Sequence, residues 1–314
     1  MHPASSVIFF TSLSGLGYGL IVALCLTKLC RLHEIADIHL AIGLIVGVVI
    51  AAFGLSLSLF HLGHPERAWR ALSQWRSSWL SREGVLALLA FMPVTAIIAA
   101  LLFLSSDTWS GLLYFAYIAA AVLSIATVYA TAMIYRTLRT IHAWHNNWVT
   151  LGYLTLSVTS GFLFANAYLH TVNDSASMLP YISVVLIAAS AIIKLMYWRH
   201  IQHSQSSSNA STALGLRDVK QVTQFTAPHT EDNYLLSEMG FQIARTHADK
   251  LRRISIAFGF VLSFVFLLPY FLHLDSLVTI SLWMSVVAVM VGIFVERWLF
   301  FAEAKHTVTL YYGR

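Results

Sequence analysis

Eight stretches of the chain are long and apolar enough to cross a lipid bilayer, and this feature constrains the fold more than any other. A spanning helix needs about 20 mostly apolar residues. Because 58% of the 314 residues are hydrophobic and only 11% are charged, a water-soluble fold is excluded. The sequence therefore predicts an all-α integral membrane protein, a bundle of about eight transmembrane helices. The stretches lie at roughly 6–27, 38–60, 84–105, 110–134, 149–170, 177–198, 254–274 and 276–300.

These stretches use most of the chain, which predicts a single membrane domain over residues 1–314. Between the sixth and seventh stretches, residues 201–250 form a polar loop. Its first part is rich in Ser, Thr, Asn and Gln, whereas 231–253 regains the helical spacing of apolar residues. That spacing predicts an amphipathic helix, lying on the membrane or against a partner subunit. Since little chain remains outside the bilayer, we expect any redox centre there to belong to another polypeptide, and this chain to be a subunit.

The positive charges fall almost entirely on one side of the predicted bundle. With eight spans, both termini and alternate loops share a side. Lys28 and Arg31 alone lie on the opposite side, and the other seventeen of the 19 Lys and Arg residues lie on the first. Because Lys and Arg mark the cytoplasmic face, we expect both termini and the 201–250 loop in the cytoplasm. No soluble basic domain with interleaved aromatic residues is visible, so nucleic acid is not an expected partner.

Small and aromatic residues predict how some of these helices pack. The first and second stretches each contain a Gly-x-x-x-Gly pair, Gly15 with Gly19 and Gly43 with Gly47. This spacing lets two backbones approach closely in lipid, so we expect the two helices to touch. Trp144 and Trp148 lie in the short loop after the fourth stretch, which is typical of an aromatic belt at the membrane interface.

The densest group of ionisable residues lies between the second and third spans. His61 ends the second span and Glu83 begins the third, and the hairpin between them contains Arg67 and Arg82. Ionisable groups at the edge of the hydrocarbon are costly unless they serve a pathway or a ligand. A quinone needs hydrogen bonds to its carbonyls and two protons on reduction, and an imidazole with a carboxylate supplies both. The pattern therefore indicates a quinone site.

Each of these residues also has a simpler interpretation. Glu83, in the first turn of a helix with Ser81 as N-cap, is favoured by the helix dipole alone. The arginines can serve to fix the topology or to bind the phosphates of membrane lipid. His61 can cap the second span. A secondary transporter is a further alternative, which predicts an internal repeat and ionisable groups near the bilayer midplane on broken helices; the sequence shows neither.

The histidines do not favour a haem. Ligation by two histidines needs imidazoles at matched depth that face each other across a bundle. The 14 histidines lie at the ends of the predicted spans or outside them, so we expect no haem, although a haem between two inner-end histidines stays open. We assign no metal ligand and no catalytic residue to the chain.

Two motifs carry a resemblance to a known family. His61-Leu-Gly-x-Pro-x-Arg-Ala68 and Ser78-Trp-Leu-Ser-Arg-Glu83, with eight spans around them, resemble the membrane-anchor subunits of the dimethyl sulfoxide reductase type, in the wider molybdenum/iron–sulfur oxidoreductase group. The resemblance covers essentially the whole chain. Within the family, residues 1–15, 233–240 and 296–313 are similar to the anchor of the cytoplasmic sulfite-oxidising enzyme.

The resemblance implies a three-part complex in the bacterial inner (cytoplasmic) membrane. Its partners are a catalytic subunit with a bis-pterin molybdenum centre and a subunit whose iron–sulfur clusters relay electrons. The anchor holds the quinone, ubiquinone or menaquinone, and no haem. It is itself either a non-catalytic or a quinone-reacting subunit of an oxidoreductase of the sulfite:quinone type. The alternatives are the anchor of a reductase that runs from quinol to substrate, and a passive anchor whose quinone site lies elsewhere.

The family's quinone-site histidine and glutamate correspond to His61 and Glu83. The inward orientation of their hairpin favours sulfite oxidation in the cytoplasm. From the adjacency of the helices, we expect the nearby ends of the first and fourth spans to wall the pocket, with Arg67 and Arg82 from the hairpin. The wall residues are Ser12, Gly15, Tyr135 and Arg136.

Overall fold

The computed structural model describes residues 5–61, 64–104, 110–172, 178–204, 208–216, 222, 225–226 and 247–312. In this part of the chain all regular secondary structure is helical, and eight helices are long and apolar enough to span a membrane. This confirms the predicted fold class. Seven spans contain one long helix each: α1 (Ser5–Leu29), α2 (Asp37–Leu57), α3 (Trp79–Phe103), α4 (Ser110–Arg136), α5 (Asn147–Val172), α6 (Leu179–His203) and α13 (Asp275–Ala302).

The seventh span is interrupted. It runs through α10 (Ala248–Ile256), the π-helical turn η3 (Ala257–Leu262), α11 (Ser263–Val265) and α12 (Leu268–Phe271). Pro269 lies in the first turn of α12, where a proline begins a helix instead of continuing one. The span begins inside the segment predicted to be loop, since α10 starts at Ala248. Of the predicted amphipathic helix, residues 231–246 lie outside the described residues.

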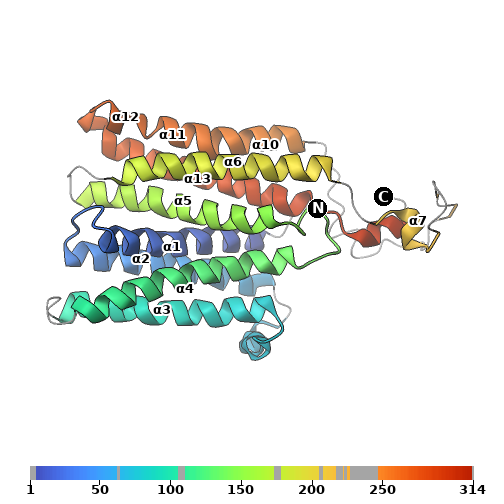
Figure 1. Ribbon diagram of the computed structural model, residues 1–314, viewed down its shortest axis with the longest axis horizontal. Helices are drawn as coiled ribbons and strands as arrows, with labels where there is room; N and C mark the ends of the chain where they lie inside the picture. The colour runs from blue at the N-terminus through green and yellow to red at the C-terminus, as the bar shows by residue number, and fades with distance from the viewer. Residues whose placement is uncertain are drawn as a thin grey trace.

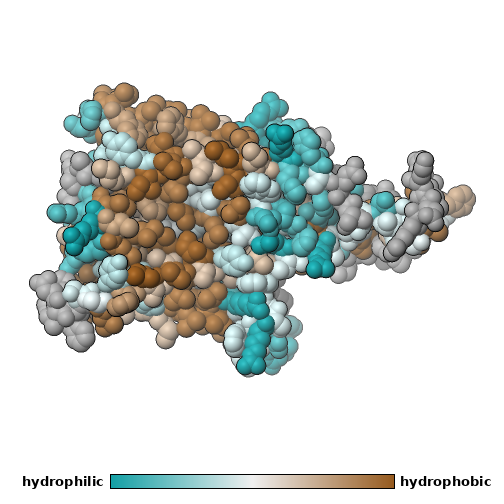
Figure 2. Space-filling view, in the orientation of Figure 1, coloured by the Kyte–Doolittle hydropathy of each residue, from teal (hydrophilic) through white to brown (hydrophobic). Residues whose placement is uncertain are grey.

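The long helices run side by side (Figure 1). On the face shown in Figure 2, an apolar band covers the middle of the bundle. One end of the bundle contains the starts of α1, α3, α5 and α10 and the ends of α2, α4, α6 and α13. We call it the basic end, because it is the side to which the sequence assigns most of the Lys and Arg residues. Four short helices lie there: η1 (Ser58–His61), η2 (Pro65–Gln74), α7 (Ala210–Ala213) and η4 (Thr307–Tyr312).

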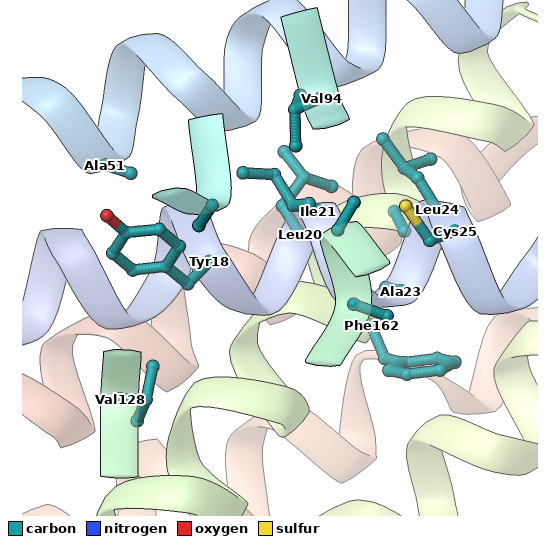
Figure 3. Close-up of a cluster of buried hydrophobic side chains, with 14 of the residues drawn as sticks. Tyr18, Leu20, Ile21, Ala23, Leu24, Cys25, Ala51, Val94, Val128 and Phe162 are labelled. Carbon is teal, nitrogen blue, oxygen red and sulfur yellow. The ribbon is translucent and has the colours of Figure 1, made fainter. Parts of the chain in front are cut away.

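Helix α1 is the centre of the bundle and packs on α2, α4, α5 and α13. Leu20, Ile21 and Leu24 have no exposed surface, and Figure 3 shows them within the buried apolar cluster around this helix. Since lipid gives no hydrophobic drive for helix association, close packing of this kind holds membrane helices together.

The predicted contact between the first two helices is confirmed, but one of the two glycine pairs faces elsewhere. A Cβ on Gly47 of α2 would lie 2.9 Å from Ile21 of α1, as the prediction requires. A Cβ on Gly19 of α1, in contrast, would lie 1.9 Å from the carbonyl oxygen of Ser157 in α5. Gly15 also lies against Ser157, whose hydroxyl donates to the Gly15 carbonyl at 2.6 Å. The pair on α1 thus brings α5 close, and the spacing alone does not identify the partner helix.

Gly161 of α5 offers a test of this packing. Its Cβ would lie 2.0 Å from the backbone of Gly19, so Gly161→Ala must push two helices apart, at a cost of about 1–3 kcal/mol in the free energy of unfolding. Gly152→Ala on the same helix is the matched control, because its Cβ meets nothing within 4 Å. We expect thermal unfolding in detergent to show a lower midpoint for the first variant only. Equal midpoints would contradict the close α1–α5 approach.

Candidate functional site

Glu83 lies in the second turn of α3 and is only 3% exposed. The helix begins earlier than predicted, because Ser78 is its N-cap and accepts the Ser81 backbone N–H at 3.4 Å. The expectation that Ser81 caps the helix is therefore wrong. Its hydroxyl instead accepts the Gln74 N–H at 3.1 Å, which ties the end of η2 to α3. Glu83 is inside the bundle, beyond the first turn where a helix dipole has its main effect.

The side chains around Glu83 come from three other helices. The hydroxyl of Thr131 on α4 donates a hydrogen bond to Glu83 Oε1. Tyr18 of α1, Tyr135 of α4 and Tyr153 of α5 lie close enough for their phenols to interact electrostatically with the carboxylate. The hydroxyls of Tyr18 and Tyr153 are buried and bond to no group among the described residues. A carboxyl surrounded in this way is costly to bury, which favours a functional role.

A small cavity lies next to Thr131, the hydrogen-bond partner of this carboxyl, between α1, α4, α5 and α13. Its volume is about 10 Å³, room for about one water molecule. Thr131 lines it together with Ser12 and Gly15, two of the residues predicted to wall the site, and its other polar lining residues include Ser157 and Arg297. A quinone headgroup does not fit inside. The structure therefore brings these two wall residues to the neighbourhood of Glu83 but leaves the headgroup to lie on another side of the carboxyl.

Tyr135 and Arg136, the other two predicted wall residues, differ in their surroundings. Tyr135 is 8% exposed and packs edge-on against Trp144 at 5.3 Å between ring centroids. Arg136 is half-buried, and its guanidinium contacts the sulfur of Met133 at 3.7 Å. Tyr135 thus lies near Glu83, whereas the guanidinium of Arg136 contacts its own helix and its backbone carbonyl accepts a hydrogen bond from the His145 ring at 2.7 Å.

The arginines of the hairpin mostly face outward. Arg67 is exposed and has a long contact of 3.7 Å with Glu66. Arg82 donates to the backbone carbonyls of Trp75 at 3.0 Å and Arg76 at 2.6 Å, and it stacks on Trp79. Arg82 therefore fixes the turn between η2 and α3. Helix η2 projects sideways from the basic end and is seen end-on in Figure 1. The side chain of His61 lies outside the described residues.

The sequence analysis missed a buried ionic cluster next to this site. Lys194 of α6 donates to Glu296 of α13, and Arg297 lies 3.3 Å from the second oxygen of Glu296. The three residues are 2–5% exposed. Lys194 and Arg297 were counted only as topology charges, although both lie inside predicted apolar stretches. Ionisable residues inside a span are the signal that indicates a functional or paired group.

A second ion pair lies nearer the aqueous side of this cluster. Arg252 of α10 donates to Glu303, just beyond α13, at 2.6 Å. Burial raises the pKa of Glu303 above its usual range, while the neighbouring Arg252 opposes this shift. Both residues line a groove of about 620 Å³ at the basic end, together with His142 and Lys305.

The eight-span bundle and its buried carboxyl define a multi-pass membrane protein with an ionisable site at the basic end. A family model described as DMSO reductase anchor subunit (DmsC) matches residues 1–313, and the chain belongs to this family. The resemblance inferred from the motifs of the hairpin is thereby confirmed.

Two curated relatives are similar to the chain. The sulfite dehydrogenase C-subunit of Allochromatium vinosum is 31% identical over 326 residues, which cover 99% of each protein. The anaerobic dimethyl sulfoxide reductase C-chain of Escherichia coli K12 is 26% identical over 169 residues, which cover 53% of this protein and 58% of the relative. No solved structure matches the chain. Both relatives are by name one polypeptide of a larger enzyme, in agreement with the expectation that this chain is part of a complex, and family membership disfavours the transporter alternative.

Proposed function

We propose that this chain is the quinone-binding anchor of a molybdenum and iron–sulfur oxidoreductase that oxidises sulfite. The observation that carries the proposal is Glu83, a carboxyl buried inside the basic end and hydrogen-bonded by Thr131. Sulfite is favoured because the relative named for sulfite aligns over the whole chain, whereas the one named for dimethyl sulfoxide aligns over about half. Electrons would arrive from an iron–sulfur partner and leave in the quinone pool.

The donor set near Glu83 suits a quinone headgroup. A bound quinone supplies two-electron chemistry and takes up two protons when it is reduced. Thr131 fixes one oxygen of Glu83, so the carboxyl has a defined direction in which to offer or accept a proton. His61 ends η1 on the far side of the hairpin and would offer the second group. Because the inner cavity holds only about one water, we place the headgroup on the hairpin side of Glu83.

The orientation can be tested with thiol reagents that do not cross membranes. Cys30 is exposed at the end of the bundle opposite the basic end, and Cys25 is buried. We expect Cys30 to react in intact cells, whereas Ser73→Cys, on exposed η2, should react only after the membrane is permeabilised. The native Cys30 serves as the internal control. Labelling of position 73 from outside, with Cys30 protected, would reverse the orientation and remove the case for a cytoplasmic partner.

The composition of the complex tests the class of enzyme. We expect the chain, purified from membranes in mild detergent, to bring down two further polypeptides with molybdenum, iron and acid-labile sulfide. Membranes should then couple sulfite oxidation to quinone reduction. Quinol-dependent reduction of dimethyl sulfoxide without sulfite oxidation would instead establish the reductase alternative, and purification without any metal-bearing partner would contradict the proposal.

A further inference from the structure

Lys194, Glu296 and Arg297 form a buried triad whose charges do not cancel. Glu296 lies between the two cations, in contact with Lys194 and 3.3 Å from Arg297. One carboxylate between two cations leaves an excess of one positive charge. In the neighbouring group, the charge of Glu303 cancels that of Arg252. Arg252 also contacts Asp249 at 3.2 Å, but the Asp249 side chain is 82% exposed, so water screens its charge from the buried triad. A buried charge without compensation is strongly unfavourable, so this excess needs negative charge within reach.

Arg297 is the member of the triad that packs on Tyr153, a neighbour of Glu83. Its guanidinium carbon lies 3.5 Å from the ring centroid of Tyr153, and this phenol interacts electrostatically with both Arg297 and Glu83. Arg297 also lines the same cavity of about 10 Å³ as Thr131, the residue that holds Glu83. The triad and the carboxyl therefore share Tyr153 as a neighbour, and Arg297 and the hydrogen-bond partner of Glu83 line one cavity with room for about one water molecule.

The other groups that face Glu83 cannot supply this positive charge. They are Tyr18 from α1, Thr131 and Tyr135 from α4, and Tyr153 from α5. All four carry hydroxyls, which are neutral or become negative. Arg82, on the same helix as Glu83, is occupied with the carbonyls of Trp75 and Arg76. The cation that interacts electrostatically with the phenols beside Glu83 is Arg297 of α13, which acts on both Tyr135 and Tyr153.

We propose that the buried triad is an electrostatic positioning element of the quinone site, whose surplus positive charge stabilises Glu83 after it has given up its proton. This inference rests on the proposed function. In the reaction, two electrons come from the iron–sulfur partner, one proton goes from Glu83 to one quinone oxygen, and a second proton reaches the other oxygen from the His61 side, which gives the quinol. The Glu83 carboxylate left behind then takes a proton back from the cytosol. The triad makes the intermediate carboxylate less costly without touching the quinone.

Three variants separate this role from a structural one, because they change the net charge in different directions. Lys194→Met lowers the charge of the triad from +1 to 0, and Glu296→Gln raises it to +2. The double variant breaks the same ion pair but keeps +1. We expect the pH at the midpoint of quinone-linked turnover to move up in the first variant, down in the second, and to stay at the wild-type value in the double variant. Each shift should be about one pH unit, as for one charge across roughly 10 Å at an effective dielectric constant of about 20.

A structural role predicts a different order. It would lower assembly or turnover in all three variants without opposite pH shifts, with the double variant at least as impaired as either single one. Single variants that moved the pH profile in the same direction would overturn the inference. An uncompensated buried charge in a single variant can prevent the complex from assembling. The double variant then still tests the proposal, because a pH profile shifted from that of the wild type in the double variant contradicts it.

The assay has two controls. Sulfite oxidation with a soluble electron acceptor, which takes electrons before the quinone, should be the same in all three variants and should show no shift in pH profile. Glu83→Gln in the same membranes separates the two claims. If that variant keeps quinone turnover, the proposed function fails; if it loses turnover while the triad variants keep the wild-type pH profile, only the present inference fails.

Discussion

Glu83→Gln is expected to lower quinone-linked turnover at least about 100-fold, the usual scale of a lost acid–base group, and to leave the amount of assembled complex unchanged. Glutamine has nearly the same shape, and its oxygen can still accept the hydrogen bond from Thr131. It cannot release or bind a proton at this position. The variant therefore removes the proton chemistry of the side chain and keeps its packing.

The measurement compares two assays on the same membranes. Turnover from sulfite to a quinone should fall, while turnover from sulfite to a soluble acceptor should not. Glu66→Gln is the matched control, since its carboxylate lies on the same hairpin but its side chain is 63% exposed. We expect no change in that variant. Wild-type quinone turnover in Glu83→Gln would show that the quinone reacts elsewhere and would favour the passive-anchor alternative.

His61→Ala is expected to lower quinone-linked turnover as well, since the imidazole is the second proposed donor to the headgroup. His64 is the control on the same hairpin, because its ring is exposed and pairs with Glu66 at 3.0 Å. His64→Ala should keep quinone turnover within about twofold of the wild type, because an exposed pair of this kind contributes little. Equal losses in both variants would assign the effect to the hairpin as a whole.

The eight spans could be predicted from the sequence because length and apolar composition are local properties. The position of Glu83 at the start of a span was visible for the same reason. Its hydrogen bond was not, since Thr131 lies 48 residues away and meets Glu83 only because α3 packs on α4. Likewise Lys194 and Glu296 are 102 residues apart, and no local pattern joins them.

The buried ionic cluster could not be predicted from a count of Lys and Arg residues on each side of the membrane, because such a count ignores how deep each residue lies in its span. Every Lys and Arg was used for topology, although Lys194 and Arg297 lie inside apolar stretches and are buried. A glutamate next to Arg297 should have indicated a buried ionic group, because such residues in spans are rare and are usually paired. Glycine spacing had a similar limit. It predicts that a helix has a close neighbour, but the neighbour of Gly19 is α5 and not the next helix in the chain.

Trp144 shows the same limit for aromatic residues, since a position in a loop next to a span predicted only an interface belt. The structure instead buries this side chain to 6% exposure. Its indole N–H donates to the Phe300 carbonyl at 2.9 Å, and its ring stacks on Phe300 with centroids 5.3 Å apart. The loop between α4 and α5 is thereby fixed to α13, next to Tyr135.

Trp144→Ala is therefore expected to destabilise the protein by about 3–5 kcal/mol, the usual cost of removing a large buried aromatic side chain. Thermal unfolding of the purified complex in detergent, monitored through the fraction of the chain that remains native at each temperature, measures the effect. Trp69→Ala on η2 is the matched control, because Trp69 is 68% exposed and a surface change of this kind stays within about 0.5 kcal/mol. Trp144→Phe should be intermediate, since the ring remains but the hydrogen bond to Phe300 is lost. If Trp144→Ala unfolds at the same temperature as Trp69→Ala, the loop is not a packing element, and Tyr135 is held beside Glu83 by its packing on α5 and α13.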